Sequence, residues 1–141
     1  MVEEHLGNMR IVAVIPARAG SKSIKNKNIV KLGKHPLVAY SIAICKLSKF
    51  VNETVVSTDS KKIANISKSY RANVPFLRPK KISQDNSSDY DFFIHYLNFL
   101  KKNGKIIPDL FLHIRPTTPL RELKVFERGI NYFIKNKNFS S

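Results

Sequence analysis

The chain has 141 residues, of which 43% are hydrophobic, and this length and composition fit one folded domain rather than two. Its single cysteine, Cys45, excludes a framework of disulfides, and no apolar run approaches the roughly 20 residues that span a bilayer, so we expect a cytoplasmic protein without membrane contacts. The formal charge of +15 favours a polyanionic partner such as nucleotide phosphates, but the lysines are scattered and no nucleic-acid-binding signature accompanies them, so we expect no nucleic-acid partner.

A short, continuous apolar run opens the ordered part of the sequence. Residues 11–15 are all apolar and stop at a proline, which predicts a strand buried on both faces. Residues 16–35 are rich in Gly, Ser, Asn and Lys and lack periodicity, so they are predicted as a loop. Pro36 suits the first position of a helix. Apolar residues at helical spacing then extend this helix to about Lys49.

The remaining elements alternate in the same way between short apolar strands and amphipathic helices. They are a strand at 54–57, a helix from 61 to about 70 that Asp59 and Ser60 can cap, an extended piece at 74–77, a helix that Ser88 caps and Asn103-Gly104 ends, a strand at 109–114, a rigid turn at 116–119 and a helix at 122–135.

This alternation predicts an α/β fold: a three-layer, Rossmann-like arrangement in which a mainly parallel sheet is flanked by helices. We expect residues 1–9 to be a flexible N-terminus, residues 10–135 to form the nucleotide-binding domain and residues 136–141 to be a frayed tail. Ligands of such sheets bind beyond the carboxyl ends of the strands, which in this chain are followed by residues 18–22, 57–59 and 115–118.

The loop after the first strand has the composition of a phosphate-binding loop. Gly20 permits a tight turn and a close backbone approach, and Ser21 adds a small hydroxyl. Positive charge surrounds them on Arg18, Lys22 and Lys27. The spacings of a Walker A loop and of a dinucleotide fingerprint are both absent, so the pattern favours phosphate binding over a plain solvated loop without naming the nucleotide.

Six segments, in the same order, resemble the N-terminal part of the acylneuraminate cytidylyltransferases (CMP-sialic acid synthetases). They are IPARAGSK at 15–22 with KNI at 27–29, KLGKHPL at 31–37, VVSTDS at 55–60, VPFLRP at 74–79, DNSSDYD at 85–91 and RPTTPLR at 115–121. The resemblance covers about residues 10–135. It implies a nucleotide-diphospho-sugar transferase-like fold that is incomplete at the C-terminus.

The resemblance also implies a reaction: the hydroxyl of a sialic-acid-like nonulosonic acid attacks the α-phosphorus of CTP, and pyrophosphate leaves. The roles implied for residues of this sequence are catalysis by Arg18 and Lys27, CTP binding by Arg18, Gly20, Ser21, Lys22, Lys27, Asn28, Arg78 and Ser88, and sugar binding by Arg115 and Thr117. Arg115 departs from the glutamine of well-known bacterial members, which leaves the acceptor sugar open. We expect Lys27→Ala to abolish turnover without unfolding the protein.

Family members continue past the length of this chain, and their metal-binding aspartates belong to that later region. We therefore expect Mg²⁺ as the cofactor but assign no metal ligand in this chain, and we expect a homodimer if the enzyme is complete. Two alternatives stay open: a CMP-octulosonic acid synthetase-like nucleotidyltransferase, and a non-catalytic basic domain that binds nucleotides or other polyanions.

Histidines and aromatic residues give no independent functional prediction. His5, His35, His95 and His113 share no metal-ligand spacing, so we expect structural roles. The aromatic residues between 90 and 99 recur at helical spacing, which favours the hydrophobic core over base stacking. Cys45 lies within an apolar run and is expected to be buried.

Overall fold

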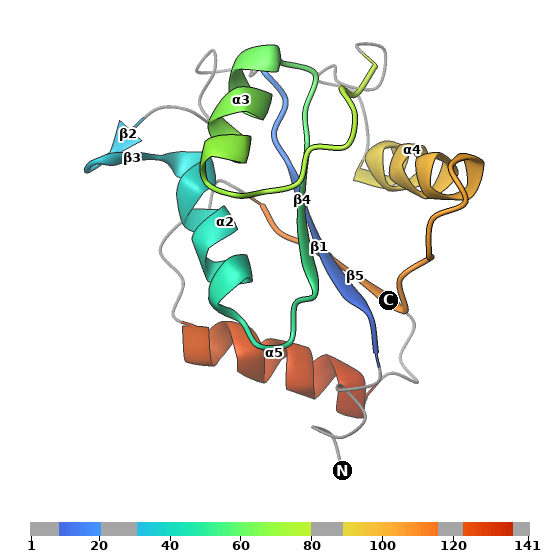
Figure 1. Cartoon of the computed structure of the whole chain (residues 1–141). Helices are drawn as coiled ribbons and strands as arrows, with labels where there is room; N and C mark the ends of the chain where they lie inside the picture. The colour runs from blue at the N-terminus through green and yellow to red at the C-terminus, as the bar shows by residue number, and fades with distance from the viewer. Residues whose placement is uncertain (1–8, 21–30, 80–88, 116–122, 137–141) are drawn as a thin grey trace.

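The centre of the protein is a parallel sheet of three strands. In the computed structural model, which describes residues 9–20, 31–79, 89–115 and 123–136, the strands are β1 (Ile11–Pro16), β4 (Glu53–Ser57) and β5 (Leu110–His113). Their order is β4-β1-β5, and β1 pairs in parallel with both neighbours (Figure 1). The prediction of a mainly parallel sheet is therefore confirmed.

Strand β1 is apolar throughout because both of its faces are covered. Residues 11–15 have no exposed surface, and Val14 lies opposite Val55 of β4 and His113 of β5. A strand in this position cannot show the alternation of polar and apolar residues found in half-exposed sheets, which explains the continuous apolar run.

Helices cover the two faces of the sheet unequally. Three of them, α2 (Leu37–Leu47), α3 (Lys61–Ser69) and α5 (Leu123–Lys135), lie on one side, and α4 (Asp89–Lys102) lies on the other (Figure 1). The packing follows the alternation of side chains along β1. Ala13 and Ile15 pack in the cluster that holds Val38, Ile42 and Ile63, whereas Val12 and Val14 pack against Phe92, Tyr96 and Leu100 of α4. The structure thus has the three layers that the sequence predicts.

A small hairpin interrupts the segment predicted as loop. Strands β2 (Lys31–Leu32) and β3 (His35–Pro36) pair antiparallel, and Gly33 at φ +68° makes the turn between them. Helix α2 therefore begins at Leu37, and Pro36 is its N-cap residue in extended conformation rather than its first helical residue. Each strand has only two residues, too few for a hydrophobic pattern to appear in the sequence.

The extended piece predicted at 74–77 is not a strand. Only Asn73 forms an isolated parallel bridge with Val55, and its N–H donates to the carbonyl of Thr54 at 2.8 Å. Pro75 has no N–H to continue such a ladder, which limits the pairing to this one residue. The other predicted helices and strands are confirmed within two residues at their described ends.

Cys45 is fully buried, as expected. Of the predicted aromatic core, Phe92 and Tyr96 are buried, and Phe93 and Phe99 pack against the same cluster. No helix in the described ranges is long and apolar enough to cross a membrane.

Candidate functional site: the carboxyl edge of the sheet

The carboxyl ends of β1 and β4 meet where the sequence places its basic loop. Residues 17–20 leave β1 there, and residues 57–60 leave β4 beside them (Figure 1). The two segments are joined directly, because the N–H of Ala17 donates to the carbonyl oxygen of Ser57 at 2.9 Å. The described part of the predicted phosphate loop is therefore held to the end of the neighbouring strand.

The same carbonyl of Ser57 also receives a hydrogen bond from Arg78. The guanidinium Nη2 of Arg78 lies 3.2 Å from the Ser57 oxygen, and the Arg78 N–H donates to the carbonyl of Thr58 at 2.7 Å. Two segments that are far apart in the sequence, 17–20 and 74–79, thus converge on the end of β4. The sequence analysis predicted that both contribute to the nucleotide site, and in the structure both contact Ser57.

Arg78 is buried to an unusual degree for an arginine. Only 6% of the residue is exposed, and the guanidinium carbon lies 5.8 Å from the centre of the Phe92 ring on α4. A guanidinium beside an aromatic ring is stabilised by the ring's electron density, and the effect is larger where water is excluded. Phe92 therefore contributes to the candidate site as the aromatic residue next to Arg78. Helical spacing alone does not distinguish this contact from ordinary core packing.

Asp59 makes a further hydrogen bond to the loop after β1. Its Oδ1 accepts a hydrogen bond from the N–H of Ala19 at 2.9 Å. The predicted helix cap is supplied by Ser60, whose side chain accepts from the N–H of Ile63 at 3.2 Å. Of the two residues predicted to cap α3, Ser60 is the N-cap residue, and the described hydrogen bond of the Asp59 carboxylate goes to the basic loop instead.

Arg18 and Gly20 lie on this loop, and Gly20 is exposed. The nearest atom to the position that a Cβ on Gly20 would occupy is Nη1 of Arg18, at 3.7 Å, an ordinary contact. The described glycines with positive φ are Gly33 and Gly104, so Gly20 is not there to adopt a left-handed conformation. What its missing side chain provides in this structure is an open backbone next to the Arg18 guanidinium.

Arg115 follows β5 at the same edge. It is exposed, and its carbonyl oxygen accepts a hydrogen bond from the Ser41 hydroxyl of α2 at 3.4 Å. His113, at the end of β5, packs its ring on Phe92 and Phe93 at centroid distances of 5.3 and 5.7 Å, which agrees with the expected structural role. The other predicted site residues lie outside the described residues; they are Ser21, Lys22, Lys27, Asn28, Ser88 and Thr117.

His95 is a neighbour of Arg78 that the sequence did not assign to the site. Its ring packs edge-on against Phe76 at 4.5 Å. Burial, and secondarily the positive charge of Arg78, lower the pKa of His95 below its usual 6.5. The neutral ring therefore adds no second positive charge beside the guanidinium.

Comparison with known protein sequences identifies the family of this chain. The sequence profile of the cytidylyltransferase family matches residues 12–138, which is most of the chain. The chain belongs to the cytidylyltransferase family. The resemblance seen in the six sequence segments is thereby confirmed, together with the class of nucleotidyltransferases to which it points.

Several cytidylyltransferases of known function are similar in sequence. The chain is 39% identical to the CMP-N,N'-diacetyllegionaminic acid synthase of Legionella pneumophila over 122 residues, 86% of this chain and 52% of that protein. It is 35% identical to the N-acylneuraminate cytidylyltransferase of Escherichia coli (80% and 26%) and 32% identical to a pseudaminic acid cytidylyltransferase of Campylobacter jejuni (92% and 56%). The chain therefore spans about half the length, or less, of the curated cytidylyltransferases that it matches.

Solved cytidylyltransferases share the fold. A CMP:2-keto-3-deoxy-manno-octonic acid synthetase complexed with CTP superposes with a TM-score of 0.74 at 17% identity, covering 91% of this chain and 48% of that one. A cytidylyltransferase from Leptospira borgpetersenii superposes with a TM-score of 0.66 at 23% identity, covering 92% and 50%. At these identities the likeness concerns the fold and does not identify the acceptor sugar.

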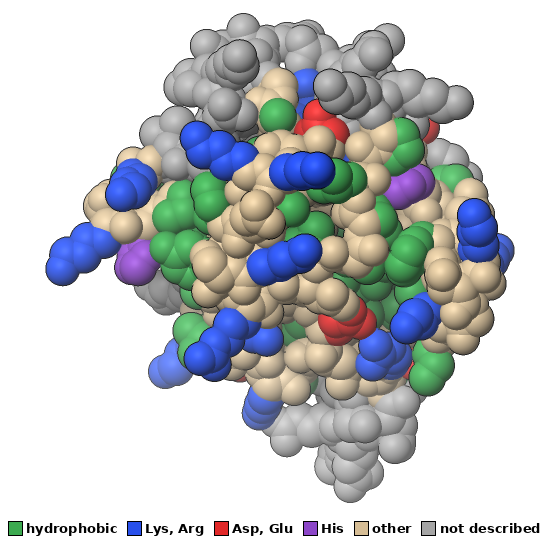
Figure 2. All heavy atoms as spheres, turned by 45° about the horizontal axis from the view of Figure 1, so that its top comes forward, with side chains coloured by type: hydrophobic (Ala, Val, Ile, Leu, Met, Phe, Trp, Pro, Cys, Tyr) green, Lys and Arg blue, Asp and Glu red, His purple; other side chains and the backbone are tan. Residues whose placement is uncertain are grey.

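The described residues of this chain do not form a metal site of their own. No group of three or more His, Cys, Asp or Glu residues within 9–20, 31–79, 89–115 and 123–136 lies close enough together to hold an ion. Figure 2, which turns the carboxyl edge of the sheet forward, shows lysine and arginine side chains spread over the described surface rather than gathered in one patch.

Proposed function

We propose that this chain binds CTP at the carboxyl edge of β1 and β4 and is part of an enzyme that transfers CMP to a nonulosonic acid. The observation that supports the proposal best is the convergence of the β1 loop and Arg78 on the Ser57 carbonyl, at 2.9 and 3.2 Å. This geometry joins two segments whose sequences resemble the nucleotide-binding segments of the family. It lies at the edge where ligands of parallel sheets bind.

The proposed roles follow the positions along the loop. Arg18, Ser21 and Lys22 hold the phosphates of CTP with the backbone around Gly20, and Lys27 and Asn28 position the α-phosphorus. The roles proposed for Arg78 and Ser88 are in cytidine binding. Arg115 and Thr117 are proposed to bind the sugar, where a guanidinium suits the carboxylate that every nonulosonic acid carries.

The proposed reaction depends mainly on the placement of the two substrates and on positive charge around the phosphates. The sugar hydroxyl attacks the α-phosphorus of CTP, the bond to the β-phosphate oxygen breaks, and pyrophosphate leaves with the negative charge. Arg18 and Lys27 stabilise the charge that builds up on the phosphate oxygens, and a preorganised site makes such contacts more effective than water does.

Mg²⁺ is proposed only as an ion bound to the triphosphate of CTP. The Oδ1 of Asp59, a described carboxylate at this edge, accepts the Ala19 N–H, and no group of three or more possible ligands is found among the described residues. The described residues therefore do not fit a protein-held magnesium site, and we derive no step through the ion. Mg²⁺ commonly binds through substrate phosphates with few protein ligands, which is compatible with this arrangement.

The acceptor is proposed as a nonulosonic acid without a choice among its members. The curated relatives act on diacetyllegionaminic, N-acylneuraminic and pseudaminic acids by their names. A cytoplasmic location is proposed along with the use of CTP, and a homodimer is proposed for the complete enzyme.

Calorimetric titration of the 141-residue chain with CTP and ATP, each with and without Mg²⁺, tests the proposal. We expect selective binding of CTP that survives physiological salt. Equal affinity for both nucleotides with a steep salt dependence would instead identify a general polyanion-binding domain. Because the chain spans only part of its relatives, turnover is measured separately, in a full-length enzyme that contains it, where Lys27→Ala is expected to abolish CMP transfer and to leave the thermal midpoint unchanged.

A further inference from the structure

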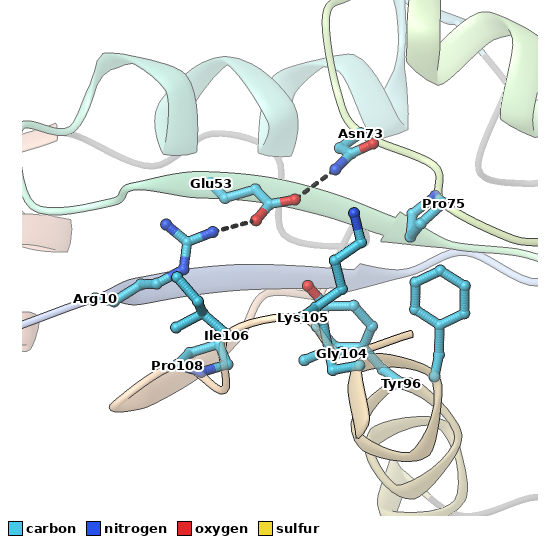
Figure 3. Close-up of a pocket in the computed structure, with 11 residues that line it drawn as sticks. Arg10, Glu53, Asn73, Pro75, Tyr96, Gly104, Lys105, Ile106 and Pro108 are labelled. Carbon is cyan, nitrogen blue, oxygen red and sulfur yellow. Dashed lines mark hydrogen bonds and ion pairs between the residues drawn. The ribbon is translucent and has the colours of Figure 1, made fainter. Parts of the chain in front are cut away.

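A cavity lies at the edge of the sheet opposite the proposed nucleotide site, where the strands begin. Its volume is about 560 Å³, which is within the usual size range of small-molecule sites. The lining comes from segments far apart in the chain (Figure 3): Arg10 precedes β1, Glu53 begins β4, Asn73 follows α3, Tyr96 lies on α4 and Lys105 follows α4. The nucleotide site proposed above does not use any of these residues.

The acidic group of this cavity is already satisfied. The Glu53 Oε1 lies 2.8 Å from Nη2 of Arg10, and its Oε2 accepts a hydrogen bond from the side-chain amide of Asn73 (Figure 3). Since both carboxylate oxygens have donors, Glu53 has little capacity left to attract a cation. The lining contains two cations, Arg10 and Lys105, and one anion, so its formal net charge is +1.

The polar groups left over are hydrogen-bond donors. Lys105 extends from the segment after α4 across the cavity, and its ammonium forms no ion pair with a described residue (Figure 3). Tyr96 is 2% exposed, and its hydroxyl lies on the side of the cavity that Arg10 and Glu53 line. Burial first, and then the Glu53 carboxylate, raise the pKa of Tyr96 to about 12, while Arg10 acts in the opposite direction. The phenol therefore keeps its proton and can donate it.

The rest of the lining is apolar and shaped by rigid residues. The aromatic wall consists of the Tyr96 and Phe99 rings of α4, and the segments on either side contribute Pro75 and Pro108. Phe76 packs on Phe99 at a centroid distance of 4.9 Å, which fixes that wall from behind. A largely apolar lining with a few convergent donors is the usual composition of a ligand site.

We propose that this cavity is a second ligand site, which binds a small monocarboxylate with an apolar, aromatic body. The carboxylate accepts from the Lys105 ammonium and the Tyr96 hydroxyl, and the apolar body packs between Phe99 and the prolines. Cations are disfavoured because the net charge of the lining is positive and Glu53 is paired. Phosphate monoesters are disfavoured because the single unpaired ammonium cannot neutralise two negative charges.

The test uses three probes of one shape: 4-methylbenzoate, its neutral amide and 4-methylbenzylamine. Ligand-observed NMR titrations with the 141-residue chain should give the tightest binding for the carboxylate, weaker binding for the amide and the weakest for the amine. Lys105→Met, which keeps the length of the side chain and removes its charge, should weaken carboxylate binding about tenfold or more, the effect expected for one charge-assisted hydrogen bond.

Lys101→Met is the matched control, because Lys101 is an exposed lysine near the end of α4 that does not line the cavity. It removes the same charge from the same end of the helix and should leave binding unchanged. Tyr96→Phe keeps the ring and should weaken the binding of the carboxylate more than that of the amide, because a hydrogen bond to a charged acceptor is the stronger of the two.

Three results would overturn the proposal. They are equal affinity for the three probes, equal effects of Lys105→Met and Lys101→Met, and displacement of 4-methylbenzoate by CTP. The last would place the carboxylate at the nucleotide site. The comparison of the three probes and the comparison of Lys105→Met with Lys101→Met do not involve CTP, so failure of the nucleotide proposal would leave this one standing, and the reverse holds too.

Discussion

The hydrogen bond from Ala19 to Asp59 should control how well the basic loop is placed for CTP. The bond joins a backbone N–H to a carboxylate oxygen across 2.9 Å in a partly buried position. Hydrogen bonds to charged groups contribute roughly 1.5–3 kcal/mol, and partial exposure puts this one at about the lower end. Asp59→Ala should therefore lower the free energy of unfolding by about 1.5 kcal/mol or less.

The effect on binding follows from the same figure. If the freed loop must be reordered whenever CTP binds, up to about 1.4 kcal/mol is withdrawn from the binding free energy, which corresponds to an affinity about tenfold weaker. Asp59→Asn retains an oxygen acceptor in the same place and should stay within about twofold of the original affinity. Isothermal titration calorimetry with CTP measures both variants, and urea unfolding measures their stability.

A matched control exists at the other edge of the sheet. Asp109 accepts a hydrogen bond from the N–H of Arg10 at 2.8 Å, so Asp109→Ala removes the same kind of bond and the same charge. It should change stability by a similar or smaller amount without changing CTP affinity. If Asp109→Ala weakened CTP as much as Asp59→Ala, or if Asp59→Ala bound CTP normally, the idea that Asp59 positions the loop would be wrong.

Three further changes test other parts of the structure. Arg78→Met removes the donor to the Ser57 carbonyl and a buried positive charge, so calorimetry should show CTP affinity reduced at least about tenfold, whereas unaltered affinity would remove Arg78 from the proposed site. Ile15→Ala, at a fully buried position, should lower the free energy of unfolding in urea by about 2–5 kcal/mol. Leu47→Ala, where 69% of the residue is exposed, should lower it by less than about 0.5 kcal/mol. Similar losses for both variants would contradict the packing described for β1. The pKa of His95 is lowered from 6.5, so below about pH 6.5 the unfolded chain binds a proton more readily than the native protein does, and the free energy of unfolding falls with falling pH. Thermal unfolding of His95→Phe between pH 7.5 and 5 should show a smaller decrease of stability than the unmodified chain. An identical decrease would exclude His95 as its source.

The sequence predicts those features whose causes are local. The apolar run at 11–15 has its pattern because a central parallel strand is buried on both faces, so strand and sheet type follow together. The helices follow from spacing and from caps such as Ser60. The convergence of the first two strand ends follows in turn, because parallel strands end at one edge of the sheet.

Contacts between distant segments are what local patterns do not contain. Asp59 and Ala19 are 40 residues apart, and nothing in either segment specifies that the carboxylate accepts that N–H rather than capping α3. The burial of Arg78 depends on Phe92 of α4, whose spacing fits a core residue equally well. The cavity lined by Lys105 and Tyr96 is composed of residues between positions 10 and 108, so its chemistry becomes visible only after folding.

The alternation of side chains along β1 links the direction of Arg18 in the following loop to the packing of the helices on the two faces of the sheet. Ala13 and Ile15 face the three helices on one side, and Val12 and Val14 face α4 on the other. Inserting or deleting one residue within this strand would exchange the two sets and also turn Arg18 by half a pleat, toward the opposite side of the sheet. A lengthening of the loop beyond Gly20 would leave both the layers and Arg18 where they are. A change in the length of the basic loop therefore disturbs the sheet least when it falls after Ala19, the residue whose N–H binds Asp59.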